Sequence, residues 1–316
     1  MIQYQEIYSS KIFKKVNKIE TFIFIVFLMF CGYLFRIYKI FPEQTAQVLN
    51  KYIIYVSLPA MVLLEVPKII LSKDIFIPLI IPWVITICGA FTIYVLSKLF
   101  NWDNKTTGVL LLVGVLGNTS FLGIPIVSHY LGDDALPYVM IYDQLGSFLL
   151  LSTYGAIVVS LYSNKNEKPN SKDILKKIFT FPPFIALILA SFLHGIKFGE
   201  KTIDILSLLG DTLVPIALIS VGFSLQLKIE KKDLSAFSFG LSTKLILIPF
   251  YSFIIVYIFN LDGLATDVSI LESAMGPMIT AGIVASASGF NEKLSSSIVG
   301  YGVVLSFLTT AIVAQL

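Results

Sequence analysis

Hydrophobic residues gather in ten runs of roughly 20 residues, the length of helix that crosses the hydrocarbon core of a bilayer. Short polar stretches separate the runs. The pattern therefore predicts an all-α polytopic membrane protein with ten transmembrane helices. The predicted spans are residues 21–38, 46–65, 75–99, 106–131, 135–162, 178–196, 203–227, 234–259, 264–289 and 294–315.

The longest polar connection, residues 163–177, separates two sets of five spans and carries five lysines. We predict a first five-helix repeat at 21–162, a cytoplasmic loop at 163–177 and a second five-helix repeat at 178–316. A basic N-terminal arm, residues 1–20, precedes the first repeat.

The two halves carry similar residues at a nearly constant separation. Pro59 in the second span and Pro215 in the seventh are 156 residues apart. A shift of 157 residues carries the fourth-span stretch 117–125 onto 274–282 in the ninth span. Because five is an odd number of crossings, the second half must enter the membrane from the opposite side. The sequence therefore predicts an inverted repeat.

Both of these stretches should interrupt a helix. The first contains Gly117, Asn118, Gly123 and Pro125, and the second reads Ala-Met-Gly-Pro-Met-Ile-Thr-Ala-Gly. Proline removes a backbone donor and clashes with the preceding turn. Unwound backbone persists at membrane depth only where it is buried in protein or lines a cavity. Corresponding interruptions in two halves point to the substrate site of a secondary transporter.

The composition, and the positions of the cysteines and histidines, exclude several classes of protein and site. The chain is 56% hydrophobic and 14% charged, whereas soluble domains carry roughly a quarter charged residues. The net charge of +3 is too small to indicate a nucleic-acid partner. Cys31 and Cys88 lie within predicted spans, and the isolated His129 and His194 form no metal-ligand cluster, so we expect neither a disulfide nor a metal. We expect no cofactor, and no phosphate-cradling loop is present, so an ion gradient, the substrate gradient or exchange must drive any transport.

The basic residues predict an orientation. Fourteen lie in the connections on one side and eight on the other. Cytoplasmic loops carry the excess of lysine and arginine, which places the loop at 163–177 in the cytoplasm and both termini outside the plasma membrane. The lysines of the N-terminal arm disagree with this assignment. They indicate either an amphipathic helix on the outer surface or an error in the number of spans.

The fourth-span sequence Gly117-Asn118-Thr119-Ser120-Phe121-Leu122-Gly123-Ile124-Pro125 resembles a motif of the auxin efflux carrier family, which includes plant auxin carriers and prokaryotic permeases for organic anions. The resemblance covers essentially the whole chain. Further matching positions are Leu58-Pro59-Ala60, Pro215-Ile216-Ala217-Leu218 with Gly222, Lys244, Pro249 and Ala274-Met275-Gly276-Pro277.

The resemblance implies a ten-helix fold similar to that of bile acid sodium symporters. Helices 1, 2, 6 and 7 would form a scaffold beside a core of helices 3, 4, 5, 8, 9 and 10. Broken helices 4 and 9 would cross near the midplane, the core would move as an elevator, and the protein would be a homodimer. In the ninth span Gly276 replaces the first of two prolines usual in prokaryotic members, so the resemblance does not identify the substrate.

The substrate-binding candidates surround the two interruptions. Asn118 would donate a hydrogen bond to a substrate carboxylate beside the free amides of the following half-helix, or would only cap that half-helix. The hydroxyls of Thr119 and Ser120 would bind the same ligand or satisfy backbone carbonyls. The substrate-binding candidates are Asn118, Thr119, Ser120, Gly276, Pro277, Thr280 and Lys244. The predicted helix-break residues are Gly117, Gly123, Pro125, Gly276 and Pro277.

Four charged residues lie deep enough in predicted spans to be candidates for coupling to H⁺ or Na⁺. Lys244 is about ten residues into the eighth span, where a lysine costs roughly 2.5 kcal/mol or more. It would neutralise an anionic substrate or pair with an acid. Asp143, Asp211 and Glu272 each lie about eight residues into a span, roughly 12 Å deep. Any acid that touches Lys244 could instead form a structural ion pair with it.

These observations favour a secondary carrier for a small organic anion, auxin-like or malate-like. The interior offers one lysine and no arginine, so a monocarboxylate fits with less strain than a dicarboxylate, but both remain open. An anion channel is one alternative. An intramembrane aspartyl protease is another, because Tyr142-Asp143 and Gly210-Asp211 partly match the motifs of such enzymes.

Overall fold

The computed structural model describes residues 18–68, 73–163, 171–193, 196, 198–225, 227 and 229–316. Within these residues the chain is helical, and its one strand-like feature is an isolated bridge between Gly117 and Pro277. Residues 1–17 of the predicted basic arm and His194 lie outside the described residues.

The helices follow the predicted spans closely, with internal divisions. In the first half they are α2 (Lys18–Ile37), α3 (Thr45–Tyr52), α4 (Leu58–Glu65), α5 (Phe76–Leu99), α6 (Asn104–Val113), α7 (Ile124–Leu131), α8 (Leu136–Ile141), α9 (Leu149–Ser152) and α10 (Tyr154–Tyr162). In the second half they are α11 (Ser171–Phe179), α12 (Pro182–Phe192), α13 (Glu200–Gly210), α14 (Leu213–Ser224), α15 (Leu234–Ser242), α16 (Ile248–Phe259), α17 (Leu264–Ser273), α18 (Ile279–Ala287) and α19 (Glu292–Val313).

Six continuous helical segments of the described chain are long and apolar enough to cross a bilayer, which makes this a multi-pass membrane protein. They are Thr45–Glu65, Lys73–Leu99, Asp133–Tyr162, Glu200–Ser224, Lys231–Phe259 and Glu292–Val313. Ile23–Ile37 and Pro182–Phe192 are apolar but shorter. The fourth and ninth predicted spans are each divided into two short helices. The ten-helix inverted repeat therefore stays a prediction.

In the described residues four π-helical turns interrupt the regular helices, and prolines explain three of them. The turns are Ile53–Ser57, Thr119–Gly123, Tyr142–Phe148 and Thr243–Leu247. Pro59, Pro125 and Pro249 each stand two residues after such a turn, in the first turn of the next α-helix. Each proline lacks an N–H and so leaves a carbonyl of the preceding turn without its usual donor, and the wider π-helical turn accommodates this loss.

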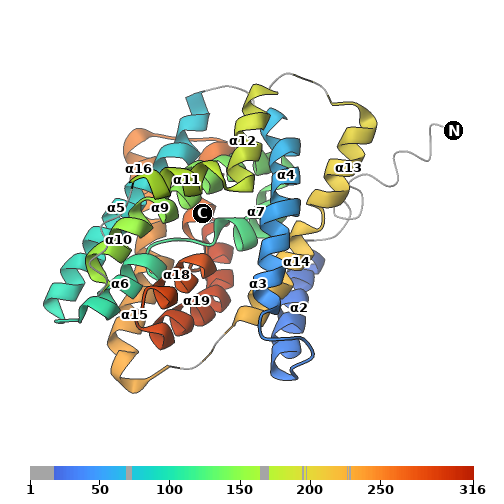
Figure 1. The fold of residues 1–316 in the computed structure, drawn as a ribbon. Coiled ribbons are helices and arrows are strands. Elements are labelled where there is room, and N and C mark those ends of the chain that lie inside the picture. Colours follow the sequence, from blue (N-terminus) through green and yellow to red (C-terminus); the bar gives the residue numbers. More distant parts are fainter. Residues whose placement is uncertain are drawn as a thin grey trace.

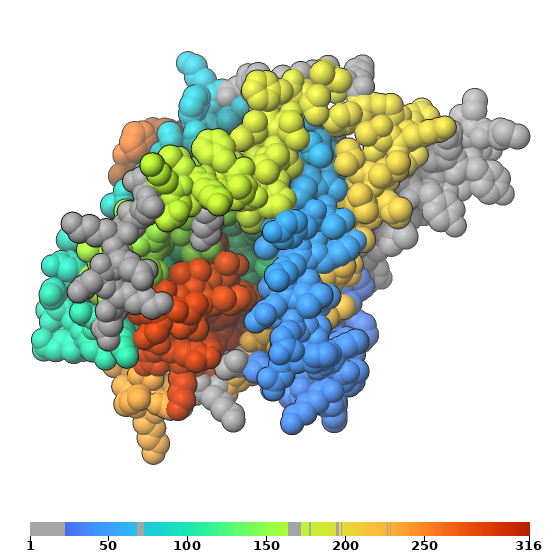
Figure 2. Space-filling model, in the orientation of Figure 1, coloured from blue at the N-terminus to red at the C-terminus, as the bar shows by residue number. Residues whose placement is uncertain are grey.

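The helices pack in two groups (Figure 1). One group consists of α2, α3, α4, α12, α13 and α14. The other consists of α5 to α10 and α15 to α19. This grouping places the same spans together as the scaffold and core that the resemblance implies. On the face shown in Figure 2, α3 and α4 (blue) run beside C-terminal residues (red).

Helices α2 and α14 are in close contact because glycines face each other's backbones. A Cβ atom at Gly222 would lie 1.9 Å from the carbonyl oxygen of Met29, and one at Gly32 would lie 2.1 Å from that of Ile219. Small residues allow this approach in membrane proteins, where packing rather than the hydrophobic effect joins helices. At the end of the pair the Arg36 guanidinium donates to the carbonyl of Leu225 at 2.7 Å.

The connection predicted as a loop at 163–177 is helical in its second part. Residues from Ser171 to Phe179 form α11, in which Ile178 is buried against the protein. Apolar residues spaced at helical intervals among the lysines of this segment explain the difference from the predicted loop.

The connection from α14 to α15 is joined to the start of α19. Glu230 pairs with Lys293 at 2.5 Å and with Lys232 at 3.1 Å, and Asn291 donates to Asp233 at 3.0 Å. Hydrogen bonds from Lys293 and Lys232 hold the pKa of the Glu230 carboxyl below its usual value. These contacts tie two connections that are far apart in the sequence.

Candidate functional site

The two interrupted spans meet through their backbones. Asn118 N donates to the carbonyl of Gly276 at 2.8 Å, and Met278 N donates to the carbonyl of Leu116 at 2.9 Å. These bonds flank the antiparallel bridge between Gly117 and Pro277. Each break thus supplies hydrogen-bond partners to part of the other's unwound backbone, as burial in a membrane requires.

Asn118 caps the helical turn that follows the first break. Its side-chain Oδ1 accepts from Phe121 N at 3.3 Å, which is the capping geometry of an N-terminal residue. Its side-chain Nδ2 is buried and has no hydrogen-bond partner in the described part of the chain. The residue therefore has one end fixed and one donor free for a ligand.

Thr119 and Ser120 bind an acid rather than backbone carbonyls. Both hydroxyls donate to Oδ1 of Asp143 at 2.6 Å, and Gln144 Nε2 donates to the other carboxylate oxygen at 2.6 Å. Asp143 is 2% exposed, so these three donors compensate its loss of water. Asp143 thereby positions the turn that follows the first break.

We expect Asp143→Ala to lower the free energy of unfolding by about 3 kcal/mol or more, because it leaves three donors without their acceptor. Thermal unfolding of the purified protein in detergent measures the change. Asp204→Ala is the control, since Asp204 is exposed on α13. Equal stability of the two variants would contradict this role for Asp143.

Lys244 is a fully buried cation. Its side chain is 1% exposed, and its Nζ donates to the carbonyl of Ser273 at 2.8 Å, at the C-terminal end of α17. The negative end of a helix dipole stabilises a cation there. Within the described residues no carboxylate lies within 4.0 Å of this ammonium, so the ion pair considered from the sequence is not formed.

Glu272 lies at the contact between the two breaks. It is fully buried, and neither carboxylate oxygen has a hydrogen-bond partner among the described residues. A Cβ atom at Gly123 would lie 2.4 Å from both oxygens, so only glycine leaves room for the carboxylate. The charges of Asp143 and Lys244 act on it electrostatically. A buried carboxylate without partners is costly, and a bound proton or cation would relieve that cost.

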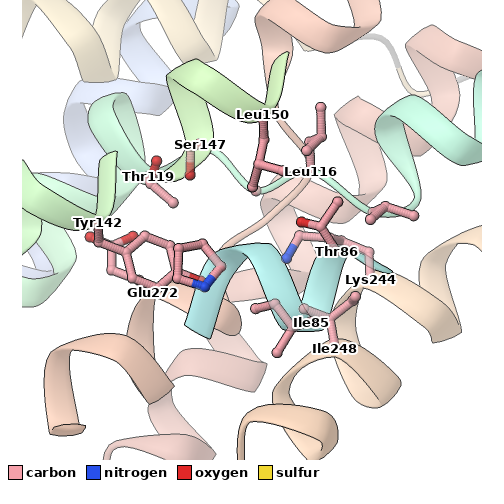
Figure 3. Close-up of a pocket in the computed structure, with 13 residues that line it drawn as sticks. Ile85, Thr86, Leu116, Thr119, Tyr142, Ser147, Leu150, Lys244, Ile248 and Glu272 are labelled. Carbon is pink, nitrogen blue, oxygen red and sulfur yellow. The ribbon is translucent and has the colours of Figure 1, made fainter. Parts of the chain in front are cut away.

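A small cavity of about 10 Å³ lies beside the contact between the two breaks (Figure 3). Lys244 and Glu272 line it together with Thr119, Tyr142 and Ser147. The volume is near the minimum that holds one water molecule and is far below that of a small-molecule site. The structure therefore has this centre closed.

Two predicted site residues lie elsewhere. Thr280 is exposed on α18, so its hydroxyl does not join the buried centre. Asp211 is exposed at the turn between α13 and α14. By contrast, Gly276 and Pro277 are buried, with the carbonyl of Gly276 occupied by Asn118 N. In the described residues no group of three or more histidine, cysteine or acidic side chains is arranged to hold a metal.

Three of the π-helical turns carry the polar groups of the centre. Thr119 and Ser120 lie in the first of these, Asp143 and Gln144 in the second, and Lys244 in the third. Turns of this kind occur frequently at functional sites. Hydropathy does not reveal these turns, and the recurring Leu-Pro or Ile-Pro pair that follows three of the four described turns is the signal that could have done so.

Comparisons with known proteins agree with a transport role. A family model described as membrane transport protein matches residues 18–314. An uncharacterized transporter of Methanocaldococcus jannaschii is 29% identical over 306 residues, which cover 93% of this chain and 96% of that protein. An uncharacterized transporter of Methanothermobacter thermautotrophicus is 24% identical over 295 residues, covering 92% and 95% of the two chains.

Proposed function

We propose that this chain, which belongs to the auxin efflux carrier family of membrane transport proteins, is a secondary carrier for a small organic anion. The observation that carries the proposal is the buried centre where the two breaks pair. It holds a free amide donor, a cation and an unpartnered carboxylate within a membrane-spanning protein. Ionisable groups at membrane depth mark substrate and ion pathways.

The donors at this centre favour a carboxylate substrate. Asn118 Nδ2 has no partner in the described residues, and Lys244 Nζ uses one of its three donors on Ser273. Hydroxyls of Thr119 and Ser120 are already bound to Asp143. With one cation and one amide available, a monocarboxylate is the substrate we propose, and a malate-like dicarboxylate would need the amide ends of the half-helices as well.

Alternating access by an elevator movement fits the packing. The centre is closed, so a substrate reaches it only after the protein rearranges. Both breaks pack within the core group of helices, and at the first break the turn Thr119–Gly123 also contacts α14 and α7 also contacts α2. Sliding of this group along α2, α4, α12 and α14 would carry the centre across the membrane. The same proposal includes the inverted ten-helix repeat, a homodimer, and a location in the plasma membrane with both termini outside.

Glu272 is the coupling residue in this proposal. Its carboxylate has no protein partner in the described residues, and it contacts the break that also carries Asn118. A proton or a sodium ion bound there would offset the cost of the buried charge. Asp143 is less suited, because three donors already satisfy it.

Uptake into proteoliposomes tests the proposal. Labelled mono- and dicarboxylates are added under an imposed proton gradient or an imposed sodium gradient. We expect saturable uptake of a monocarboxylate under one of the two gradients. If no carboxylate moves under either gradient, and none exchanges, a carrier of organic anions is excluded.

Variants of Asn118 distinguish a role in substrate binding from a role in helix capping. We expect Asn118→Ala to abolish uptake, with a loss of about 1 kcal/mol in stability from the missing cap. Asn118→Ser is the control, because serine caps a helix as well as asparagine but has no amide donor. We expect Asn118→Ser to be stable and equally inactive in transport. Normal uptake by the serine variant would reduce Asn118 to a structural cap.

The alternatives have less support. A protease would need Asp143 and Asp211 to act together, yet Asp143 is buried under three donors and Asp211 is exposed between α13 and α14. A channel would need a continuous path, whereas the cavity at the breaks holds about 10 Å³.

A further inference from the structure

A second cavity, far more apolar than the first, lies between the two groups of helices. It encloses about 310 Å³, which is within the lower range of small-molecule sites. We call it the α2–α19 groove. Its lining residues are Val26, Met29, Phe30, Tyr33, Leu225, Leu227, Val304 and Phe307.

The groove opens toward the bilayer. Phe30 is 55% exposed on the apolar helix α2, and Val304 is 46% exposed on α19, which is long and apolar enough to cross a bilayer. Water gains little in this site, because seven of its eight lining residues are apolar and Tyr33 alone carries a polar side-chain group. A single hydrocarbon chain is the occupant that fits both the shape and the surroundings.

A cation stands at one end of the groove. Arg36 lies three residues after Tyr33 on α2, on the same face of the helix, and its Nη1 is fixed on the carbonyl of Leu225. A guanidinium has five donors, and within the described residues no acid lies within 4.0 Å of it. It is also the one arginine of the chain. Arginine binds phosphate in a two-pronged geometry that lysine does not reproduce.

We propose that the α2–α19 groove binds one acyl chain of an anionic phospholipid whose phosphate is held by Arg36. The lipid would sit between α2 and α14 of one helix group and α19 of the other. It would therefore contact both bodies that the elevator movement displaces.

Native mass spectrometry of the full-length protein, stripped of lipid in detergent, tests this site. Phosphatidylglycerol and phosphatidylcholine with identical chains are the probes. We expect one retained phosphatidylglycerol, bound about fivefold more tightly than phosphatidylcholine, since a basic residue at the membrane surface contributes about that factor. Arg36→Gln should remove the preference, whereas Lys39→Gln, at an exposed basic residue nearby, should keep it.

A second pair of variants tests the groove itself. Val304→Trp fills it and should weaken binding of both lipids, whereas Ile312→Trp, two turns further along the exposed side of α19, should not. An unchanged preference in Arg36→Gln would overturn the proposal. Wild-type lipid binding in Val304→Trp would overturn the proposal as well. An altered oligomeric mass of that variant would then make the groove an interface between copies of the chain. Neither readout depends on the transported substrate.

Discussion

Glu272→Gln should uncouple transport from its driving gradient. Glutamine has the shape of glutamate but cannot bind a proton or hold a cation by charge. We expect gradient-driven accumulation of the substrate to fall by about tenfold, which is within the usual range of coupling between sites. Exchange of labelled for unlabelled substrate, which needs no gradient, should continue. Parallel assays of accumulation and exchange in the same proteoliposomes measure both.

The matched control is Glu292→Gln, at an acid in the first turn of α19 that is exposed. This variant should accumulate substrate as the wild type does. If Glu272→Gln accumulates substrate normally, the coupling ion binds elsewhere and Glu272 has a structural role. If both accumulation and exchange are lost while the protein remains folded, the residue is needed for substrate movement rather than for coupling.

Gly123→Ala adds one methyl group, which should lower the stability of the protein and stop transport. Gly123 already has helical backbone angles, so alanine is compatible with its conformation. Its methyl would lie 2.4 Å from both oxygens of Glu272 and would force that buried side chain to move. We expect a loss of about 1–3 kcal/mol in the free energy of unfolding, typical of overpacking. Thermal unfolding in detergent and uptake in proteoliposomes give the two readouts.

Gly155→Ala provides the comparison. Gly155 is also helical and buried, but a Cβ there would have ordinary contacts, the nearest at 3.4 Å from Leu151. It should be neutral or slightly stabilising, because alanine is the better helix former. In a Glu272→Ala background the penalty of Gly123→Ala should disappear. A penalty that persists there would assign the effect to another neighbour.

Much of the fold follows from the linear pattern. Apolar runs predict the helices because a bilayer demands about 20 such residues for each crossing. The breaks at Gly117 and Gly276 are visible because glycine and proline oppose a helix whatever surrounds them. That Lys244 needs a buried partner also follows from its depth.

The partners themselves depend on three-dimensional packing. A carbonyl accepts from any donor that the fold brings near, so the choice of Ser273 by Lys244 has no signature in the sequence. Asp143 and Glu272 look alike as acids in apolar runs, yet one has three donors and the other has none among the described residues. Asp211 has a similar sequence environment and is exposed. The depth of each charged residue along its helix can be predicted from the sequence, whereas the direction of its side chain cannot.

The contact between α2 and α14 sets a condition on biosynthesis. Arg36 and its acceptor on Leu225 are 189 residues apart, so a ribosome adding about 5–20 residues per second needs roughly 10–40 s to make the second after the first. Throughout that interval the glycine face of α2 lacks α14, its partner in the folded protein. The first helix therefore enters the membrane early and gains its final partner late. Two separately expressed halves, divided within 164–170, should reassemble through this face when they are produced together.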